Sequence, residues 1–233
     1  MKWWSDRENW TVKPVIDPAT GKYKNEYFFE GAPAQRIPIS SRLARNLAGY
    51  ALIERDLRMV QQWLQKVHEL SKAQLDEEKA GWHLTEKNDL DHNLALGLFV
   101  AAVTFYGKCF AQCEGRKIKL ERDIIPSELR DAHDNMIRFR NNLAAHSGAE
   151  KFEDVQIVLV LKPKDSDQKP VLSRELIQPE ALVDLRDEDR GFSNLVEYVR
   201  KRVLTKIEEI NGKIFTEEIN PKGLDYWNSK NLY

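Results

Sequence analysis

Apolar side chains recur every three or four residues in four long stretches of the chain, which is the spacing of one face of an α-helix. These stretches cover about 40–71, 86–113, 126–148 and 190–218. The stretch at 86–113 is apolar on all sides near its middle, so we expect it to be the most buried helix. Together the stretches predict a mainly α-helical fold, a bundle of about four helices.

Two other regions are rich in β-branched and aromatic residues, which is typical of strands. The first pairs 12–16 with 23–29 across a turn that contains Gly21, and it predicts an N-terminal β-hairpin arm. The second pairs about 155–161 with 170–177, and it predicts a β-hairpin between the last two helices.

The chain therefore has three expected parts. The arm occupies 1–38, the helical bundle with its hairpin insertion at about 155–177 occupies 39–220, and a tail occupies 221–233. The arm carries three tryptophans: Trp3, Trp4 and Trp10. They either stack on nucleic-acid bases or dock the arm on the bundle or on a partner subunit, and docking is the interpretation we favour.

The charge balance limits the classes of function. Lys and Arg number 36 and Asp and Glu number 37, so any RNA contact depends on a local basic patch. The start of the chain is Trp-rich and charged, and no segment has the pattern of a signal peptide or a membrane span. We therefore expect a cytoplasmic protein that does not contact a membrane.

The two cysteines, Cys109 and Cys113, lie four residues apart in a helical pattern. This spacing fits two buried thiols, or half of a zinc site. A zinc site needs further ligands, and no cluster of Cys and His supplies them. We favour core thiols and expect neither a metal nor a cofactor.

The segment 136–148 combines side chains that can carry chemistry, because Arg140 and His146 bracket Asn141 and Asn142. Arg140 falls in an apolar stripe, where a guanidinium must be paired, solvated at an interface, or used. Six residue steps place Arg140 and His146 about 120° apart around an ideal helix and roughly 9 Å apart along it. The reach of Arg140, a loosened last turn, or a second copy of the segment from a partner subunit can still bring them together.

The run from Arg140 to His146, RNNLAAH, resembles the signature of the HEPN superfamily, the higher eukaryotes and prokaryotes nucleotide-binding proteins. That signature is an Arg, often followed by Asn, and then a His near the end of a helix in an α-helical bundle. Many members have Lys where this chain has Asn142. The preceding run up to His133 is also similar to uncharacterised bacterial HEPN-like proteins, and the resemblance covers roughly 95–148.

The resemblance implies a metal-independent endoribonuclease, a hydrolase of phage defence or of a toxin–antitoxin system. His146 would take the proton of a ribose 2′-hydroxyl or protonate the leaving 5′-oxygen, since imidazole titrates near neutral pH. Arg140 would offset the charge that grows on the phosphate, and Asn141 or Asn142 would orient the His or the phosphate. HEPN proteins commonly dimerise through the motif face, so we expect a homodimer that supplies an acid and a base from two copies. A protein partner such as an antitoxin is also expected.

Residues near the motif are expected to bind the RNA substrate: Asn142, Arg138, Arg116, Lys117 and Lys119. A solvated loop is the alternative interpretation of the basic segment 116–122. His133 lies seven residues before Arg140 and therefore on nearly the same helix face. It either hydrogen-bonds a structural partner or orients the site.

A different class of function fits the same residues. In a non-catalytic HEPN-like module that binds a nucleotide, RNA or a protein, Arg140 and His146 would lock a dimer through hydrogen bonds and a helix-end charge contact. A plain structural bundle is the third hypothesis. The near-zero net charge favours a protein partner, whereas the basic segment 116–122 favours RNA.

Overall fold

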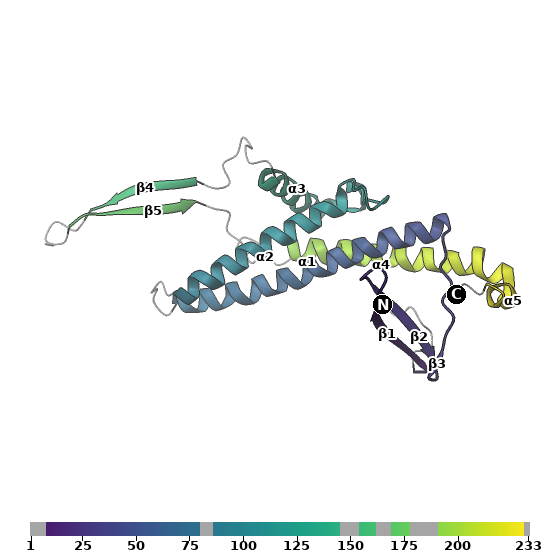
Figure 1. The fold of residues 1–233 in the computed structure, drawn as a ribbon. Coiled ribbons are helices and arrows are strands. Elements are labelled where there is room, and N and C mark those ends of the chain that lie inside the picture. Colours follow the sequence, from purple (N-terminus) through teal and green to yellow (C-terminus); the bar gives the residue numbers. More distant parts are fainter. Residues whose placement is uncertain (1–7, 80–85, 145–153, 162–168, 178–190, 231–233) are drawn as a thin grey trace. The chain divides into compact units, whose positions relative to one another are not determined.

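The structure is a computed structural model that describes residues 8–79, 86–144, 154–161, 169–177 and 191–230. Within these residues the fold is mainly α-helical with small antiparallel β-hairpins, as the sequence predicts (Figure 1). The long helices of the described part are α1 (Arg42–Lys79), α2 (Glu86–Phe110), α3 (Arg130–Ala144) and α4 (Phe192–Lys213).

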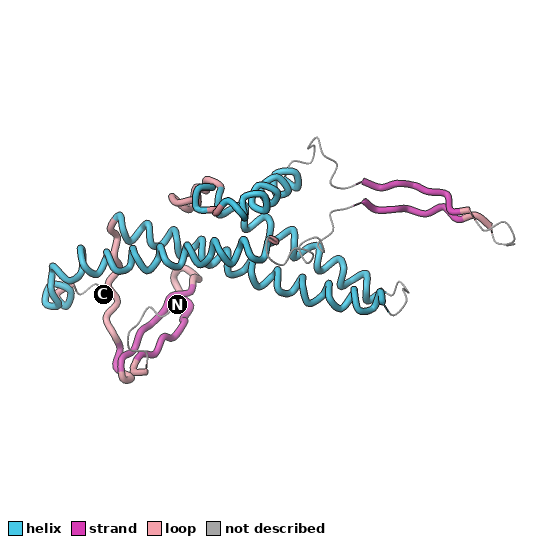
Figure 2. Tube along the Cα trace, turned by 180° about the vertical axis from the view of Figure 1, so that it is seen from behind, coloured by secondary structure: helices cyan, strands magenta, loops and turns pink. Residues whose placement is uncertain are grey.

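Short helical turns precede α3 and follow α4. Two 3₁₀ turns lead into α3: η1 (Arg122–Ile124) and η2 (Ser127–Leu129). After α4 come a π-helical turn, a 3₁₀ turn and a short α-helix: η4 (Ile214–Ile219), η5 (Asn220–Lys222) and α5 (Gly223–Asn228). Figure 2 shows the same elements from behind, with helices and strands in different colours.

Both hairpins lie where the sequence predicts them, and one gains a further strand. The strands are β1 (Trp10–Ile16), β2 (Tyr23–Phe29), β3 (Ala32–Pro33), β4 (Asp154–Val160) and β5 (Val171–Ile177). The first three form one antiparallel sheet in sequence order, and the last two form another. The strand β3 is an addition to the expected hairpin. It forms because Glu30 and Gly31, with φ of 47° and 81°, make a tight turn of the kind that joins hairpin strands.

The start of α1 and the end of α2 are fixed by polar contacts. The hydroxyl oxygen of Ser41 accepts a hydrogen bond from the backbone N–H of Ala44 at 3.0 Å and so caps the start of α1. The helix α1 has 38 residues and continues past the predicted end near 71, because the residues there are mostly good helix formers. The helix α2 ends at Phe110, and the guanidinium of Arg116 donates to the carbonyl oxygen of Lys108 in its last turn.

Contacts divide the chain into two compact units. The first consists of Met1–Arg45 and Ile210–Tyr233, so the described parts of the arm and the tail belong together. Within it, the side-chain amide of Gln35 donates to the carbonyl oxygen of Lys230 at 3.0 Å. The second unit, Asn46–Glu209, holds most of the core and the motif helix.

Aromatic contacts connect the helices of the second unit. Trp63 of α1 meets Phe105 of α2 edge-on, with ring centroids 4.9 Å apart. Phe99 of α2 meets Phe139 of α3 at 5.6 Å and Phe192 of α4 at 6.2 Å. The helix α2 therefore contacts each of the other three, and this agrees with its expected place in the core.

One helix of the described part, α2, is long and apolar enough over Leu90–Phe110 to cross a membrane by length and composition. Its apolar positions include Phe99, Val103 and Tyr106, which are buried against the other helices. The core helix of a helical bundle meets the same two criteria, because such a helix is also apolar on most of its circumference.

A buried carboxylate joins α1 to the end of α2 and to the segment that follows it. Asp56 of α1 is fully buried, and its carboxylate contacts Arg55 at 2.8 Å, Lys108 at 3.0 Å and Arg116 at 3.6 Å. Its Oδ2 atom has no hydrogen bond of good geometry, so attraction to the Lys108 ammonium and the Arg116 guanidinium is mainly ionic. Because the Arg116 side chain is only 4% exposed, the two buried charges depend on each other.

We predict that Asp56→Asn lowers the free energy of unfolding by about 3 kcal/mol, because the buried guanidinium of Arg116 loses its counter-charge. Urea denaturation of the purified protein measures the change. The matched control is Lys66→Ala, which removes an exposed ion pair with Glu69 on the same helix. That control should cost less than about 1 kcal/mol. Equal losses for the two variants would contradict a structural role of the buried carboxylate.

Candidate functional site

The motif helix α3 forms because its apolar residues share one face that packs on the core. Leu129, just before the helix, is buried, and Ala132, Met136, Ile137 and Phe139 are partly buried against the core cluster. The opposite face carries polar and charged side chains in water. This division is the amphipathic pattern that the sequence shows, and it fixes which motif residues can reach the core.

Arg140 lies at the edge of the packed face and is half-buried. The aliphatic part of its side chain packs against Gly107 of α2. At the far end, Nη1 donates to the side-chain oxygen of Asn141 at 3.0 Å. Asn141 itself is exposed, and Asn142 is half-buried and has an interaction partner. The structure therefore brings Arg140 and Asn141 into direct contact at the surface of α3.

His146 lies outside the described residues, which end at Ala144 in this part of the chain. The joint role of Arg140 and His146 therefore stays a prediction from the sequence.

His133 is buried on the inner face of α3, about two helical turns before Arg140. The hydroxyl of Tyr106 lies 2.7 Å from its Nδ1 atom, and the Phe110 ring packs on it at 4.5 Å between centroids. In the neutral imidazole with its proton on Nε2, Nδ1 accepts this hydrogen bond. Burial lowers the pKa of His133 below its usual value, because the imidazolium would lose its hydration. The structure thus gives His133 a structural partner in α2.

The segment between α2 and α3 alternates between inward and outward side chains. Arg116 and Leu120 are buried, and Ile118 packs against Gly49 of α1. Lys117 and Lys119 point into solvent between them. The segment is therefore held on both sides while it presents two cations on its surface.

The two arginines that are expected to bind RNA, Arg116 and Arg138, have different surroundings. Arg116 is buried and paired with Asp56, so we assign it a structural role. Arg138 is exposed on α3, and its guanidinium donates to the side-chain oxygen of Asn135 at 3.1 Å. Lys119, also exposed, lies 3.2 Å from a carboxylate oxygen of Glu121. Of the expected basic residues, only Arg116 is withdrawn from solvent.

The cysteines show the environment of core thiols. Cys109 is fully buried and donates to the carbonyl oxygen of Phe105, and Cys113 is half-buried. Burial raises the pKa of the Cys109 thiol to about 12, so it stays protonated at neutral pH. Within the part of the chain that the structure describes, no group of three His, Cys, Asp or Glu side chains could hold a metal ion.

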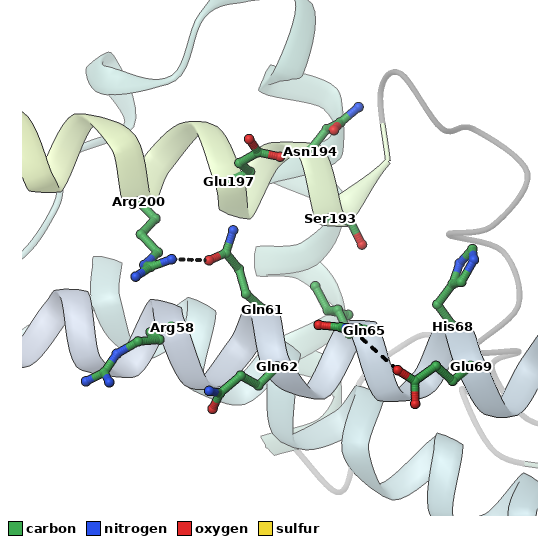
Figure 3. Close-up of a pocket in the computed structure, with 11 residues that line it drawn as sticks. Arg58, Gln61, Gln62, Gln65, His68, Glu69, Ser193, Asn194, Glu197 and Arg200 are labelled. Atoms are coloured by element: carbon green, nitrogen blue, oxygen red, sulfur yellow. Dashed lines mark hydrogen bonds between the residues drawn. The ribbon is translucent and has the colours of Figure 1, made fainter. Parts of the chain in front are cut away.

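A concave surface lies between α1 and α4, with a volume of about 670 Å³ (Figure 3). Most of the residues that line it are polar: Arg58, Gln61, Gln62, Leu64, Gln65, His68, Glu69, Ser193, Asn194, Glu197 and Arg200. Arg200 is engaged with Gln61 at 2.7 Å and with the buried carboxylate of Glu54 at 2.8 Å, and Arg58 lies 3.6 Å from Glu54. Since carboxylates accompany its arginines, this groove offers little net charge for an anion.

Sequence reasoning missed the two buried acids of α1, Glu54 and Asp56. Both acids lie next to Ile53 and Leu57 of the apolar stripe of α1. This position in the sequence was the feature that could have indicated their burial. Comparisons of the chain with protein-family models, with curated proteins and with solved structures found no match. The assignment of function therefore depends on the motif and on the surroundings of its residues.

We predict that His133 makes stability fall as the medium becomes acidic. Its folded-state pKa is lowered, so its contribution is complete above the unfolded pKa of about 6.5 and is lost as the pH falls below that value. The free energy of unfolding should decrease between pH 7 and pH 5 by no more than about 1.4 kcal/mol per pH unit.

The variant His133→Gln, which cannot take up a proton, should show a smaller decrease in urea denaturation over the same pH range. His68→Gln changes an exposed histidine and is the control that should keep the parent's pH dependence. An unchanged pH dependence in His133→Gln would contradict the assignment.

Proposed function

We propose that this chain is a metal-independent endoribonuclease of the HEPN type, with Arg140 and His146 as its catalytic pair. The observation that carries the proposal is the state of Arg140. It is half-buried in an apolar stripe, yet among the described residues its guanidinium has the amide oxygen of Asn141 as partner and no carboxylate. A guanidinium without a counter-charge there can bind the two oxygens of a phosphate.

The chemistry would be an internal transfer of the phosphate in RNA. The ribose 2′-hydroxyl attacks the adjacent phosphorus, and a His146 imidazole takes its proton as a general base. The bond from phosphorus to the 5′-oxygen breaks, and an imidazolium returns a proton to that oxygen. Arg140 offsets the negative charge on the phosphate oxygens in the transition state. The products are a 2′,3′-cyclic phosphate and a free 5′-hydroxyl, and no metal takes part.

A homodimer would supply the acid and the base from two copies of His146. The expected substrate contacts are Arg138 and Asn142 on α3 and the solvent-facing cations Lys117 and Lys119. Arg138, Lys117 and Lys119 are exposed to solvent, and Asn142 is half-buried. In contrast, Arg116 contributes by holding the segment that carries the two lysines.

A protein partner is the second candidate, and the β4–β5 hairpin is the observation that favours it. Val155, Ile157 and Leu159 alternate along β4 and therefore share one face, on which Leu172 lies opposite Leu159. Each of these four side chains is at least half exposed. Exposed apolar faces of this kind are typical of surfaces that bind protein. An antitoxin that controls the nuclease in the cytoplasm could bind this surface. The same surface is also consistent with a binding module that has no catalytic activity.

We predict that His146→Ala lowers the rate of RNA cleavage by at least about 100-fold, because the reaction loses its proton carrier. Arg140→Ala should also abolish cleavage, because the transition state loses its charge partner. Cleavage of end-labelled RNA measures both rates, and analysis of the product ends detects the 2′,3′-cyclic phosphate. RNA with a 2′-deoxy sugar at the scissile position should stay intact.

The control for the imidazole is His68→Ala, an exposed histidine of α1. It should cleave at the parent rate, and circular dichroism should show the same helix content in all variants. If His146→Ala cleaves as fast as the parent, the proposed catalytic pair is wrong. If the parent cleaves no RNA and both motif variants only dissociate the dimer, as seen by light scattering, the binding module replaces the nuclease.

The proposed mechanism also predicts that cleavage persists in excess EDTA. The reaction requires an imidazole and a guanidinium, and neither needs a divalent ion to act. Rates measured with EDTA and with added Mg²⁺ or Mn²⁺ test this expectation. Loss of cleavage in EDTA that either ion restores would replace the mechanism with a metal-assisted one.

A further inference from the structure

Gly107 of α2 occupies a position where any side chain would meet Arg140. A Cβ atom built there lies 3.0 Å from Cγ, 3.2 Å from Cδ and 3.4 Å from Cβ of Arg140. The backbone of Gly107 is helical and does not have the positive φ that favours glycine. A glycine inside a helix costs stability relative to alanine. Glycine is therefore needed at position 107 because a side chain has no space there, and not because the backbone adopts an unusual conformation.

The atoms that a Cβ would meet belong to the near end of the Arg140 side chain. Their position fixes the direction of the whole side chain, so a shift of a few tenths of an ångström at Cγ grows along the remaining bonds to the guanidinium. The helix α3 cannot relieve the contact easily by moving away, because the Tyr106–His133 hydrogen bond of 2.7 Å and the Phe99–Phe139 ring contact hold it on α2.

We propose that Gly107 is a positioning residue. Because it has no side chain, it leaves space on α2 for the Arg140 side chain, and this space directs the Arg140 guanidinium toward the phosphate of the substrate. The inference rests on the proposed function for the role of Arg140. It adds a residue outside the motif on which the site depends. The hydrogen bond from Nη1 of Arg140 to Asn141 holds the far end of the same side chain, so the guanidinium is fixed from both ends.

The first test uses Gly107→Ala in the full chain, with cleavage of labelled RNA as the measurement. We expect kcat to fall on the order of 100-fold with little change in KM, because the guanidinium is displaced from the transition state by a short distance. Gly97→Ala is the matched control, since Gly97 lies on the same helix, is exposed, and has no atom within 4 Å of an added Cβ. The control should keep the parent's kcat. Equal kcat in Gly107→Ala and the parent would overturn the proposal.

The second test does not depend on catalysis. Thermal melting of the parent, Gly107→Ala, Arg140→Ala and the double variant forms a double-mutant cycle. Gly107→Ala should lower Tm by a few degrees in the parent, and it should leave Tm unchanged or raise it when Arg140→Ala has removed Cγ and Cδ. The same loss of Tm in both backgrounds would overturn the proposal.

The cycle also covers a variant that does not fold. If Gly107→Ala is unfolded and the double variant folds, the contact with Arg140 is the cause and the proposal is supported. If both are unfolded, the space at Gly107 serves another neighbour and the proposal is overturned. If the parent cleaves no RNA, the proposed function is wrong. If the cycle shows no coupling between Gly107 and Arg140, the proposed positioning role of Gly107 is wrong.

Discussion

The ionic contacts of the buried Asp56 carboxylate with Lys108 and Arg116 are the interactions on which the remaining structure of the second unit depends. The carboxylate is removed from water, and it can stay charged there only because cations from α2 and from the following segment reach it. The Arg116 guanidinium that faces it also donates to the carbonyl oxygens of Lys108 and Ile118. One buried ion pair therefore ends α2, sets the turn after it, and ties both to α1.

The position of α3 follows from that turn. After Arg116 the chain places Leu120 in the core, and two short 3₁₀ turns then lead to the start of α3. On the inner face, α3 meets α2 through the buried hydrogen bond between Tyr106 and His133 and through the close approach at Gly107. A buried hydrogen bond fixes the rotation of a helix about its axis more strictly than apolar packing does, since a misplaced polar group is costly. The side chain of Arg140 consequently has a defined place at the edge of the core.

The sequence was sufficient for the helices and hairpins, because periodicity follows directly from which side chains are buried. It was not sufficient for Arg116, which looked like one member of a basic segment. Its burial depends on Asp56, a residue sixty positions earlier, and no local pattern records a pairing over that distance. The hydrogen bond between His133 and Tyr106 could not be predicted for the same reason, since the sequence pattern shows Tyr106 only as an apolar position of α2.

Arg116, Arg140 and Arg200 of the second unit all pack against other helices or segments, and their partners distinguish them. Arg116 faces the carboxylate of Asp56, and Arg200 faces the carboxylate of Glu54 at 2.8 Å. Both charges are cancelled inside the fold, which is what a structural role requires. Arg140, which is half-buried, has a neutral amide as its partner within the described residues, and the aliphatic part of its side chain packs against Gly107. A protein that needed Arg140 only for stability would gain from a carboxylate beside it. The neutral partner keeps the charge of Arg140 available, and that is the property a site for a phosphate requires.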